Sequence, residues 1–258
     1  MFKNILSGIK SYFGTVSLIS KLKLWKYFAI PILISFLLGG VFIALAYFLA
    51  SPLGMLISKI WVWEYGKETF TSISVYLGGF LVIVMGIVVY KHIVMALSAP
   101  FMSPVSEKVE RHLVGDISHI HRQTTFRAQL LRGIRINIRN LIRELIFILP
   151  LVVLSLIPVV GIVATILIFV VQAYYVGFGN MDYTMERHFS YKDSIEFVRK
   201  HRGVAIGNGL LFMLMLFIPV LGFIFTLPIS VVAASTETVR VLKNEKKFEG
   251  TTLETKEI

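Results

Sequence analysis

One five-residue pattern occurs twice in this sequence, and it limits how the chain can cross a lipid bilayer. The copies occupy 157–161 and 218–222, each near the middle of a long apolar stretch. Proline breaks or kinks a helix because it removes a backbone donor and clashes with the preceding turn. The glycine that follows permits a left-handed or otherwise tight backbone. Each copy therefore predicts a turn within lipid. The turn residues are Pro158, Gly161, Pro219 and Gly222.

The apolar arms on either side of these turns are short. The two apolar stretches run over 145–178 and 204–234, so that each turn divides its stretch into two arms. A full crossing needs about 20 apolar residues, and the arms 145–157 and 222–234 fall short of that length. We therefore expect two re-entrant helical hairpins, which enter the membrane and return to the side they came from.

The composition is also that of a membrane protein. Hydrophobic residues make up 56% of the sequence, and the net charge of +11 is better explained by the positive-inside rule than by binding to nucleic acid. The chain has no cysteine, which excludes disulfides, thiolate metal sites and thiol catalysis. No long polar stretch is present that would hold a second domain. We expect a single membrane domain over 1–241 and a polar C-terminal tail over 242–258.

Two long apolar runs precede the hairpins. Residues 27–50 and about 73–101 predict transmembrane helices, joined by a charge-neutral, aromatic-rich outer loop over 51–72. Residues 1–20 gather apolar side chains on one side at helical spacing, which predicts an amphipathic helix lying in the membrane interface. The predicted fold is an all-α integral membrane protein with two long transmembrane helices, two re-entrant helical hairpins and an N-terminal interfacial helix.

Charged residues mark the side of the membrane on which the loops lie. With re-entrant hairpins, the N-terminus, the basic loops and the C-terminal tail all share one side, which the positive-inside rule assigns to the cytoplasm. Lys91 and His92 fall inside the second predicted span. They either reach the inner headgroups or face a wet interior.

Two basic segments have alternative interpretations. Residues 21–26, with three lysines and a tryptophan, fit a membrane boundary or, alternatively, an anion site at a helix start. Further along, an arginine stripe follows one helical face. It suits a surface that faces solvent or lipid phosphates or, alternatively, the wall of an anion vestibule. The stripe consists of Arg132, Arg135, Arg139 and Arg143.

Catalytic and metal-binding patterns are missing from the sequence. It contains no G-x-S-x-G, no G-x-x-x-x-G-K and no H-E-x-x-H, the patterns of acyl transfer, nucleotide binding and zinc catalysis. His112, His119 and His121 are interpreted as surface histidines rather than metal ligands. We expect no enzyme activity and no cofactor. Any transport is then driven by a gradient or coupled to an ion.

The end of the second span combines helix breakers with charge. Pro100 and Pro104 are expected to interrupt the helix there, and Glu107 and Glu110 are spaced to share one helix face beside Arg111. Broken helices at membrane depth are tolerated where they are buried or line water. The three charged residues are therefore candidates to line or gate an interior path.

This same segment resembles a known family. Residues 99–110 read A-P-F-M-S-P-V-S-E-K-V-E, similar to the A-P-F-x-x-x-x-x-E-x-V-E segment of the CysZ-type sulfate permeases, which share a superfamily with the etoposide-induced membrane proteins. The second hairpin also resembles the family, with I-P at 218–219, proline at 228 and A-A-S-T at 233–236. The resemblance covers roughly 7–241. It implies a bacterial inner-membrane protein that dips two helix pairs into the membrane and assembles as a homo-oligomer.

The resemblance further implies passive uptake of sulfate or a similar inorganic anion for cysteine synthesis. The family's sulfate-binding motif, G-L-R followed by a second basic residue, aligns with Lys23, Leu24, Trp25 and Lys26. Lysine here replaces the glycine and tryptophan replaces the first arginine. Without the glycine we expect no tight backbone turn, and without the arginine no bidentate contact to an oxyanion. The lysines still attract an anion as point charges.

Two hypotheses follow from these observations. The first is a passive anion channel or permease, with Lys23 and Lys26 at the entrance and Glu107, Glu110 and Arg111 along the path. The alternative is a non-transporting membrane scaffold or bilayer-shaping protein, since an interfacial helix, an arginine stripe and shallow hairpins all act on one leaflet. Both hypotheses include membrane lipids among the partners.

Overall fold

The structure is a computed structural model that describes residues 1–59, 64–115, 125–155, 157–218 and 221–245, without the side chains of residues 80, 81, 84, 221 and 223. These residues are all-helical, as predicted, and contain no strand. In chain order the helices are α1 (Phe2–Lys10), α2 (Thr15–Lys21), the 3-10 helix η1 (Leu24–Tyr27), α3 (Ala29–Ser58), α4 (Lys67–Val114), α5 (Phe126–Ser155), α6 (Val160–Met185), α7 (Tyr191–Lys200), α8 (Arg202–Leu216) and α9 (Leu221–Asn244).

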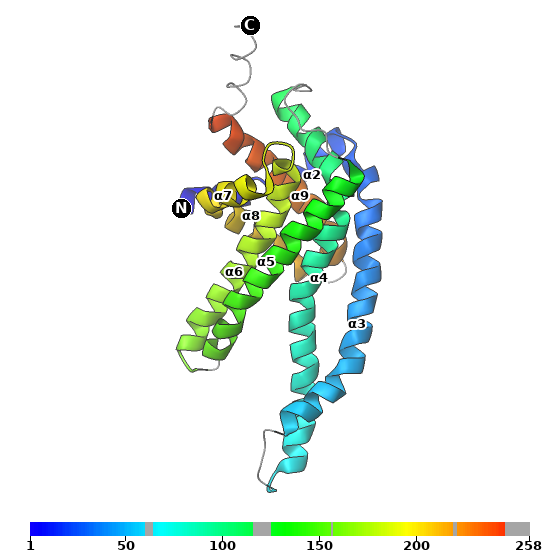
Figure 1. Cartoon of the computed structure of the whole chain (residues 1–258), viewed down its shortest axis with the longest axis vertical. Helices are drawn as coiled ribbons and strands as arrows, with labels where there is room; N and C mark the ends of the chain where they lie inside the picture. Colours follow the sequence, from blue (N-terminus) through cyan, green and yellow to red (C-terminus); the bar gives the residue numbers. More distant parts are fainter. Residues whose placement is uncertain (60–63, 116–124, 156, 219–220, 246–258) are drawn as a thin grey trace.

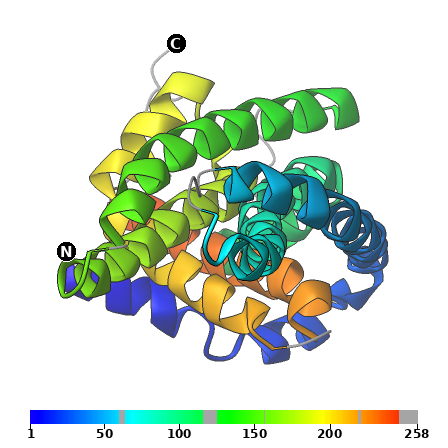
Figure 2. The same cartoon turned by 90° about the horizontal axis from the view of Figure 1, so that it is seen from below.

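Two helix pairs dominate the shape of the molecule. α3 and α4 pack side by side. The end of α3 and the start of α4 extend beyond all other helices at the bottom of Figure 1. α5 and α6 form a second pair. Their joined ends also point toward the bottom of Figure 1, but they lie apart from the tips of α3 and α4. α1 and α8 pack together close to the N-terminus (Figure 2). The end of α3 and the start of α4, like the end of α5 and the start of α6, therefore point toward one end of the molecule (Figure 1).

The long spans predicted from the sequence are present. Within the described residues, four segments are long and apolar enough to cross a membrane: Leu24–Ser58, Met85–Val114, Val160–Met185 and Ile224–Asn244. The first consists of η1 and α3 and the second lies in α4. Both long helices run further than predicted, and α3 passes through Pro52. α8 is apolar but shorter than a span, and α5 is charged over its first half. Each predicted hairpin thus pairs a helix that is long and apolar enough to span the membrane with one that is not: α6 with α5 in the first hairpin, and α9 with α8 in the second. The re-entrant path stays a prediction.

The first hairpin turn is built differently from the expectation. Its tight backbone lies at Val159, with φ 69° and ψ −54°, and not at Gly161. The amide of Val160 donates to the carbonyl oxygen of Pro158 at 2.9 Å, which makes a γ-turn, a strained conformation for a branched residue. Gly161 instead allows a close approach, because a Cβ there would lie 2.3 Å from the Ser155 carbonyl oxygen.

The second turn repeats the glycine contact. A Cβ at Gly222 would lie 2.3 Å from the carbonyl oxygen of Met215. Pro219 lies outside the described residues. In both copies, therefore, the glycine lets the start of one helix pack against the end of the preceding one.

α4 passes through Pro100 and Pro104 without a break, so the expected interruption was wrong. A proline in a helix leaves the carbonyl four residues earlier without its donor. For Pro100 that carbonyl belongs to Ala96, against which α5 packs closely through Gly133. Helix interruption is avoided where neighbouring helices pack around the proline. α4 is consequently one continuous axis to which the charged residues of the site are attached.

The predicted N-terminal helix is two helices. Gly14, with φ 83°, separates α1 from α2. α1 packs on α8 through Gly8, where an added Cβ would lie 2.5 Å from the Val204 carbonyl oxygen. Its apolar side chains face outward, with Phe2 83% and Leu6 53% exposed. Outward apolar residues on this element agree with the predicted interfacial position.

Candidate functional site

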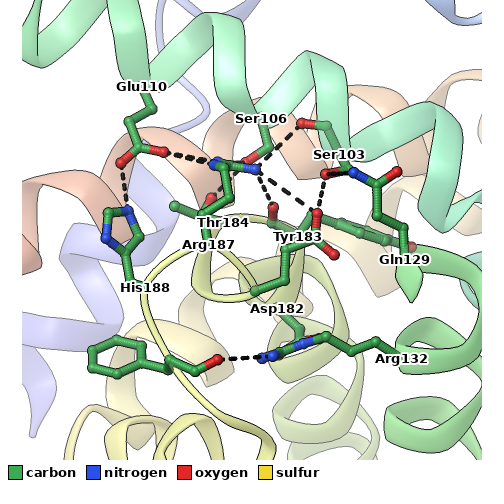
Figure 3. Close-up of polar contacts among 12 residues, drawn as sticks. Ser103, Ser106, Glu110, Gln129, Arg132, Asp182, Tyr183, Thr184, Arg187 and His188 are labelled. Atoms are coloured by element: carbon green, nitrogen blue, oxygen red, sulfur yellow. Dashed lines mark hydrogen bonds and ion pairs between the residues drawn. The ribbon is translucent and has the colours of Figure 1, made fainter. Parts of the chain in front are cut away.

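An arginine-centred cluster joins α4 to the end of α6 inside the protein (Figure 3). Arg187 donates to Glu110 Oε2 from Nε at 3.0 Å and from Nη2 at 2.8 Å, and Nη2 also donates to Ser106 Oγ at 2.7 Å. His188 contacts the other carboxylate oxygen of Glu110. The side chains of Glu110 and Arg187 are 1% and 4% exposed. We name this group the arginine cluster. Its members are Ser103, Ser106, Glu110, Thr184, Glu186, Arg187 and His188.

A second guanidinium lies beside this cluster on α5 (Figure 3). Arg132 makes a bidentate ion pair with Asp182, from Nε to Oδ2 at 3.0 Å and from Nη2 to Oδ1 at 2.8 Å. It also donates to the carbonyl oxygen of Phe189 and to Ser194 Oγ. Bidentate pairs of this kind are strong and fix geometry. Arg132, the first residue of the arginine stripe, therefore ties α5 to α6 and α7 and faces the interior.

Glu186 is a titratable group of this region whose charge changes near neutral pH. It directly follows α6, is 3% exposed and accepts a hydrogen bond from Ser103. Burial raises the pKa of Glu186 to about 7, against the hydrogen bond from Ser103 and with support from the nearby carboxylate of Asp182. The arginine cluster therefore gains a negative charge as the pH rises through this value.

A second buried cluster lies further along α4. Lys91 donates from Nζ to Glu144 Oε1 at 2.5 Å and to Gln172 Oε1 at 3.0 Å. His92 contacts Glu144 Oε2 through Nε2 at 2.7 Å and Asn137 Oδ1 through Nδ1 at 3.2 Å. These five residues form the lysine cluster. Lys91 and His92 thus neither reach headgroups nor face water; they are 1% and 2% exposed and are paired within the protein.

A mostly apolar layer separates the two clusters, with the buried Ser98 as the polar residue of this stretch of α4. Met95, Ala99 and Met102 on α4 are fully or almost fully buried there. The hydroxyl of Tyr183 crosses this layer to donate to the carbonyl oxygen of Met95 at 2.6 Å. At 1.5 Å per helical residue, Ser103 lies about 18 Å along the axis from Lys91. The interior beside α4 is therefore polar at two levels and closed between them by flexible methionines.

The predicted path residues separate in the structure. Glu110 lies inside the arginine cluster, whereas Glu107 pairs with Arg111 at 2.9 Å on the outside, with side chains 46% and 58% exposed. The i,i+3 spacing puts Glu107 and Glu110 on neighbouring positions of α4. The side of the helix that packs against the rest of the protein includes Glu110 but not Glu107. Of the three predicted residues, Glu110 alone contacts the buried arginine.

The predicted entrance residues lie where α2 gives way to the first span. Lys23 has φ 54° and ψ 43°, so the left-handed turn is present although glycine is absent, and the expectation of no tight turn was wrong. Leu24 is buried, whereas Lys23, Trp25 and Lys26 are exposed. Lys26 and Lys108 of α4 place their ammonium groups 5.4 and 5.5 Å from the ring of Tyr27. A pair of exposed ammonium groups thus flanks one aromatic ring at this end of α4.

Four charged residues in or beside these clusters were not singled out from the sequence. Asp182, Glu186 and Arg187 lie at the end of an apolar stretch, and Glu144 lies at the start of one. Ionisable residues at membrane depth are costly and usually paired, so Lys91 in the second span was a signal to search for an acidic partner. His119 and His121 lie outside the described residues. Among those that are described, no group of His, Asp and Glu side chains is arranged to hold a metal ion.

The clusters offer groups that recognise an oxyanion. Guanidinium, ammonium and hydroxyl groups from α4, α5 and α6 converge on the interior, and each donates hydrogen bonds to oxygen atoms there. A family model for "Sulfate transporter CysZ/Etoposide-induced protein 2.4" matches residues 11–226. The chain belongs to this family. The description names CysZ as a sulfate transporter, and membership in this family agrees with the apolar helices and with the resemblance seen in the sequence. No curated protein matches this member of the CysZ family.

Proposed function

We propose that this protein is a passive channel or permease for sulfate or a similar oxyanion, and that it acts in the bacterial inner membrane as a homo-oligomer with both termini in the cytoplasm. The observation that carries the proposal is the pair of buried clusters along α4 in a member of a sulfate transporter family. Buried charges cost free energy unless paired, and at membrane depth they commonly mark a transport path.

The arginine cluster supplies the chemistry for an anion. The positive charges of Arg187 and Arg132 equal the negative charges of Glu110 and Asp182. When Glu186 is protonated, these five side chains together therefore carry no net charge. An oxyanion that enters would exchange its hydration for hydrogen bonds from Ser103, Ser106 and the guanidinium of Arg187. Binding of moderate strength follows, because the carboxylates compete with the anion for the same donors. A conducting pore needs sites that also release the ion.

The apolar layer provides a gate in this proposal. Met95 and Met102 separate the arginine cluster from the lysine cluster, and an apolar constriction blocks ions by excluding water. A change in methionine rotamers would open the layer without breaking an ion pair, since methionine side chains are flexible. The anion would then pass from the donors around Arg187 to Lys91 and His92.

The lysines before the first span form the entrance in this proposal. Lys23 and Lys26 are exposed, and Lys108 lies with Lys26 beside Tyr27. Exposed ammonium groups raise the local concentration of a dianion, an effect that salt screens. Glu107 and Arg111 would border this entrance rather than the interior.

Sulfate flux into proteoliposomes tests the proposal. Vesicles with the purified protein should take up labelled sulfate down its gradient, without nucleotide, well above protein-free vesicles. Lys23→Ala/Lys26→Ala should lower the initial rate severalfold at low ionic strength and less at high salt. Lys3→Ala/Lys10→Ala, which removes two exposed charges from α1, is the matched control and should keep the wild-type rate.

The outcomes separate the site from the function. A rate unchanged by the double substitution would remove Lys23 and Lys26 from the path and leave the transport claim standing. An absence of flux for every inorganic anion tried would remove the transport claim. Co-purification of a stoichiometric partner with no conductance would favour the scaffold hypothesis instead.

A further inference from the structure

A basic groove runs along the outer face of α5, away from both buried clusters. It has a volume of about 650 Å³, and three guanidinium side chains border it together with aliphatic and aromatic ones. The lining residues are Arg135, Ile138, Arg139, Ile142, Arg143, Ile146 and Phe147. Except for Arg132, which turns inward, the arginine stripe of the sequence therefore forms one wall of a surface groove.

Two of these guanidinium groups are held in place by aromatic rings. Arg135 lies over the ring of Tyr191, with its Cζ 4.0 Å from the ring centroid. Arg139 lies 5.1 Å from the ring centroid of Phe178 and donates from Nη1 to Asn140 Oδ1 at 2.8 Å. Stacking on a ring leaves the edge of a guanidinium available for further hydrogen bonds. The groove thus contains donors that are positioned in advance.

Among the described residues, no carboxylate forms an ion pair with the arginines of the groove. Arg199 and Arg202, at the junction of α7 and α8, add to the positive charge on this side of the protein. Their guanidinium groups, like those of Arg139 and Arg143, lie near the hydroxyl of Tyr174. In the part of the chain that the structure describes, none of these four arginines forms an ion pair. Glu144 is the nearby acid, but it is wholly buried and engaged by Lys91 and His92.

The groove also crosses from charged to apolar surface. Arg143 is the last base of α5, and from Leu145 the helix is apolar up to Ser155. Ile142, Ile146 and Phe147 are more than half exposed along the groove. A surface with basic groups above and exposed apolar side chains below has the polarity of a lipid molecule at the membrane interface. A hydrated inorganic anion would not be stabilised by contact with the apolar half of the groove.

We infer that this groove binds an anionic phospholipid, with the phosphate between Arg139 and Arg143 and the acyl chains along Ile142, Ile146 and Phe147. Charge complementarity selects this occupant, since several unpaired guanidinium groups at an interface favour a phosphate and the apolar lining favours its chains. The bound lipid would neutralise the repulsion between Arg139 and Arg143. It would do so independently of any transported anion.

Lipid binding to the full chain, counted by native mass spectrometry from detergent, tests the inference. The probes are phosphatidylglycerol, phosphatidylcholine with identical chains, and inorganic phosphate. We expect phosphatidylglycerol to bind at least tenfold more tightly than phosphatidylcholine, and inorganic phosphate not to displace it. Arg139→Gln/Arg143→Gln should weaken phosphatidylglycerol binding by tenfold or more.

Two further variants guard against misfolding and non-specific attraction. Lys3→Gln/Lys21→Gln removes the same charge from exposed residues of α1 and α2 and should change binding less than twofold. Arg143→Gln alone alters an exposed side chain, should keep the melting temperature and should still weaken binding severalfold. Equal loss in the two double variants, equal affinity for the two lipids, or displacement by inorganic phosphate would each overturn the inference.

Discussion

Lys91 of α4 and Glu144 of α5 form an ion pair with no exposed side-chain surface, the Nζ atom lying 2.5 Å from Oε1. Gln172 and His92 complete the hydrogen bonding of both groups. Charges this deep are kept only when every partner is in place. The pair therefore fixes α4 against α5 and α6 below the apolar layer.

Removing one member of this pair should destabilise the protein strongly. Glu144→Gln or Lys91→Met leaves an uncompensated buried charge, which costs about 3–5 kcal/mol. The double variant Lys91→Met/Glu144→Gln should recover part of that loss, measured as the melting temperature in detergent. The exposed pair Glu107–Arg111 is the control, and its double glutamine variant should cost about 0–1 kcal/mol. Additive losses at Lys91 and Glu144 would show that the two side chains are not coupled.

Anion flux should depend on pH through Glu186. Its pKa is raised to about 7, so the carboxyl is mostly neutral at pH 6 and mostly charged at pH 8. Ser103, Asp182, Arg132 and Arg187 surround it, and a negative Glu186 repels an entering anion. Flux should therefore rise as the pH falls through 7, by up to roughly tenfold between pH 8 and pH 6 if the neutral form alone conducts.

The same shift should appear in stability. A carboxyl whose pKa is higher folded than unfolded favours the folded state at low pH, so stability should rise as the pH falls from 7 toward 4.5. Glu186→Gln should flatten both profiles. A wild-type flux profile that Glu186→Gln leaves unchanged would assign the pH dependence to another group.

The two hairpin glycines should be sensitive to a single methyl group. Gly161→Ala and Gly222→Ala each place a Cβ 2.3 Å from a backbone carbonyl oxygen, and overpacking of this kind costs about 1–3 kcal/mol. Gly39→Ala in α3 is the control, because a Cβ there meets no atom within 4 Å. It should leave the melting temperature unchanged or slightly higher. Equal melting temperatures for all three variants would rule out the close helix contacts at the turns.

The local features of the fold were readable from the sequence, because they depend on neighbouring residues. Apolar runs predicted α3 and α4, and the doubled proline–glycine pattern marked the turn between α5 and α6. The details of that turn were not readable. Glycine is the usual residue for a positive φ, yet Val159 and Lys23 adopt it while Gly161 serves packing. Surrounding contacts override intrinsic preference at these positions.

The pairing of the buried charges was beyond the sequence for a different reason. Arg187 and Glu110 are 77 residues apart, and Lys91 and Glu144 are 53 apart. Periodicity shows which residues share a helix face, but it does not show which two faces meet. Glu107 and Glu110 looked equivalent on that basis, and only packing against α6 distinguishes them.

The most direct test of the central claim places a cysteine in the apolar layer beside α4. The natural chain has no cysteine, so an introduced thiol is the sole target of a negatively charged methanethiosulfonate reagent. Sulfate flux through Met102→Cys should fall to the background of protein-free vesicles after treatment, and sulfate should slow the loss. Leu97→Cys, on the outer side of α4 at 39% exposure, should be unaffected. Undiminished flux through modified Met102→Cys would contradict a path between the arginine and lysine clusters.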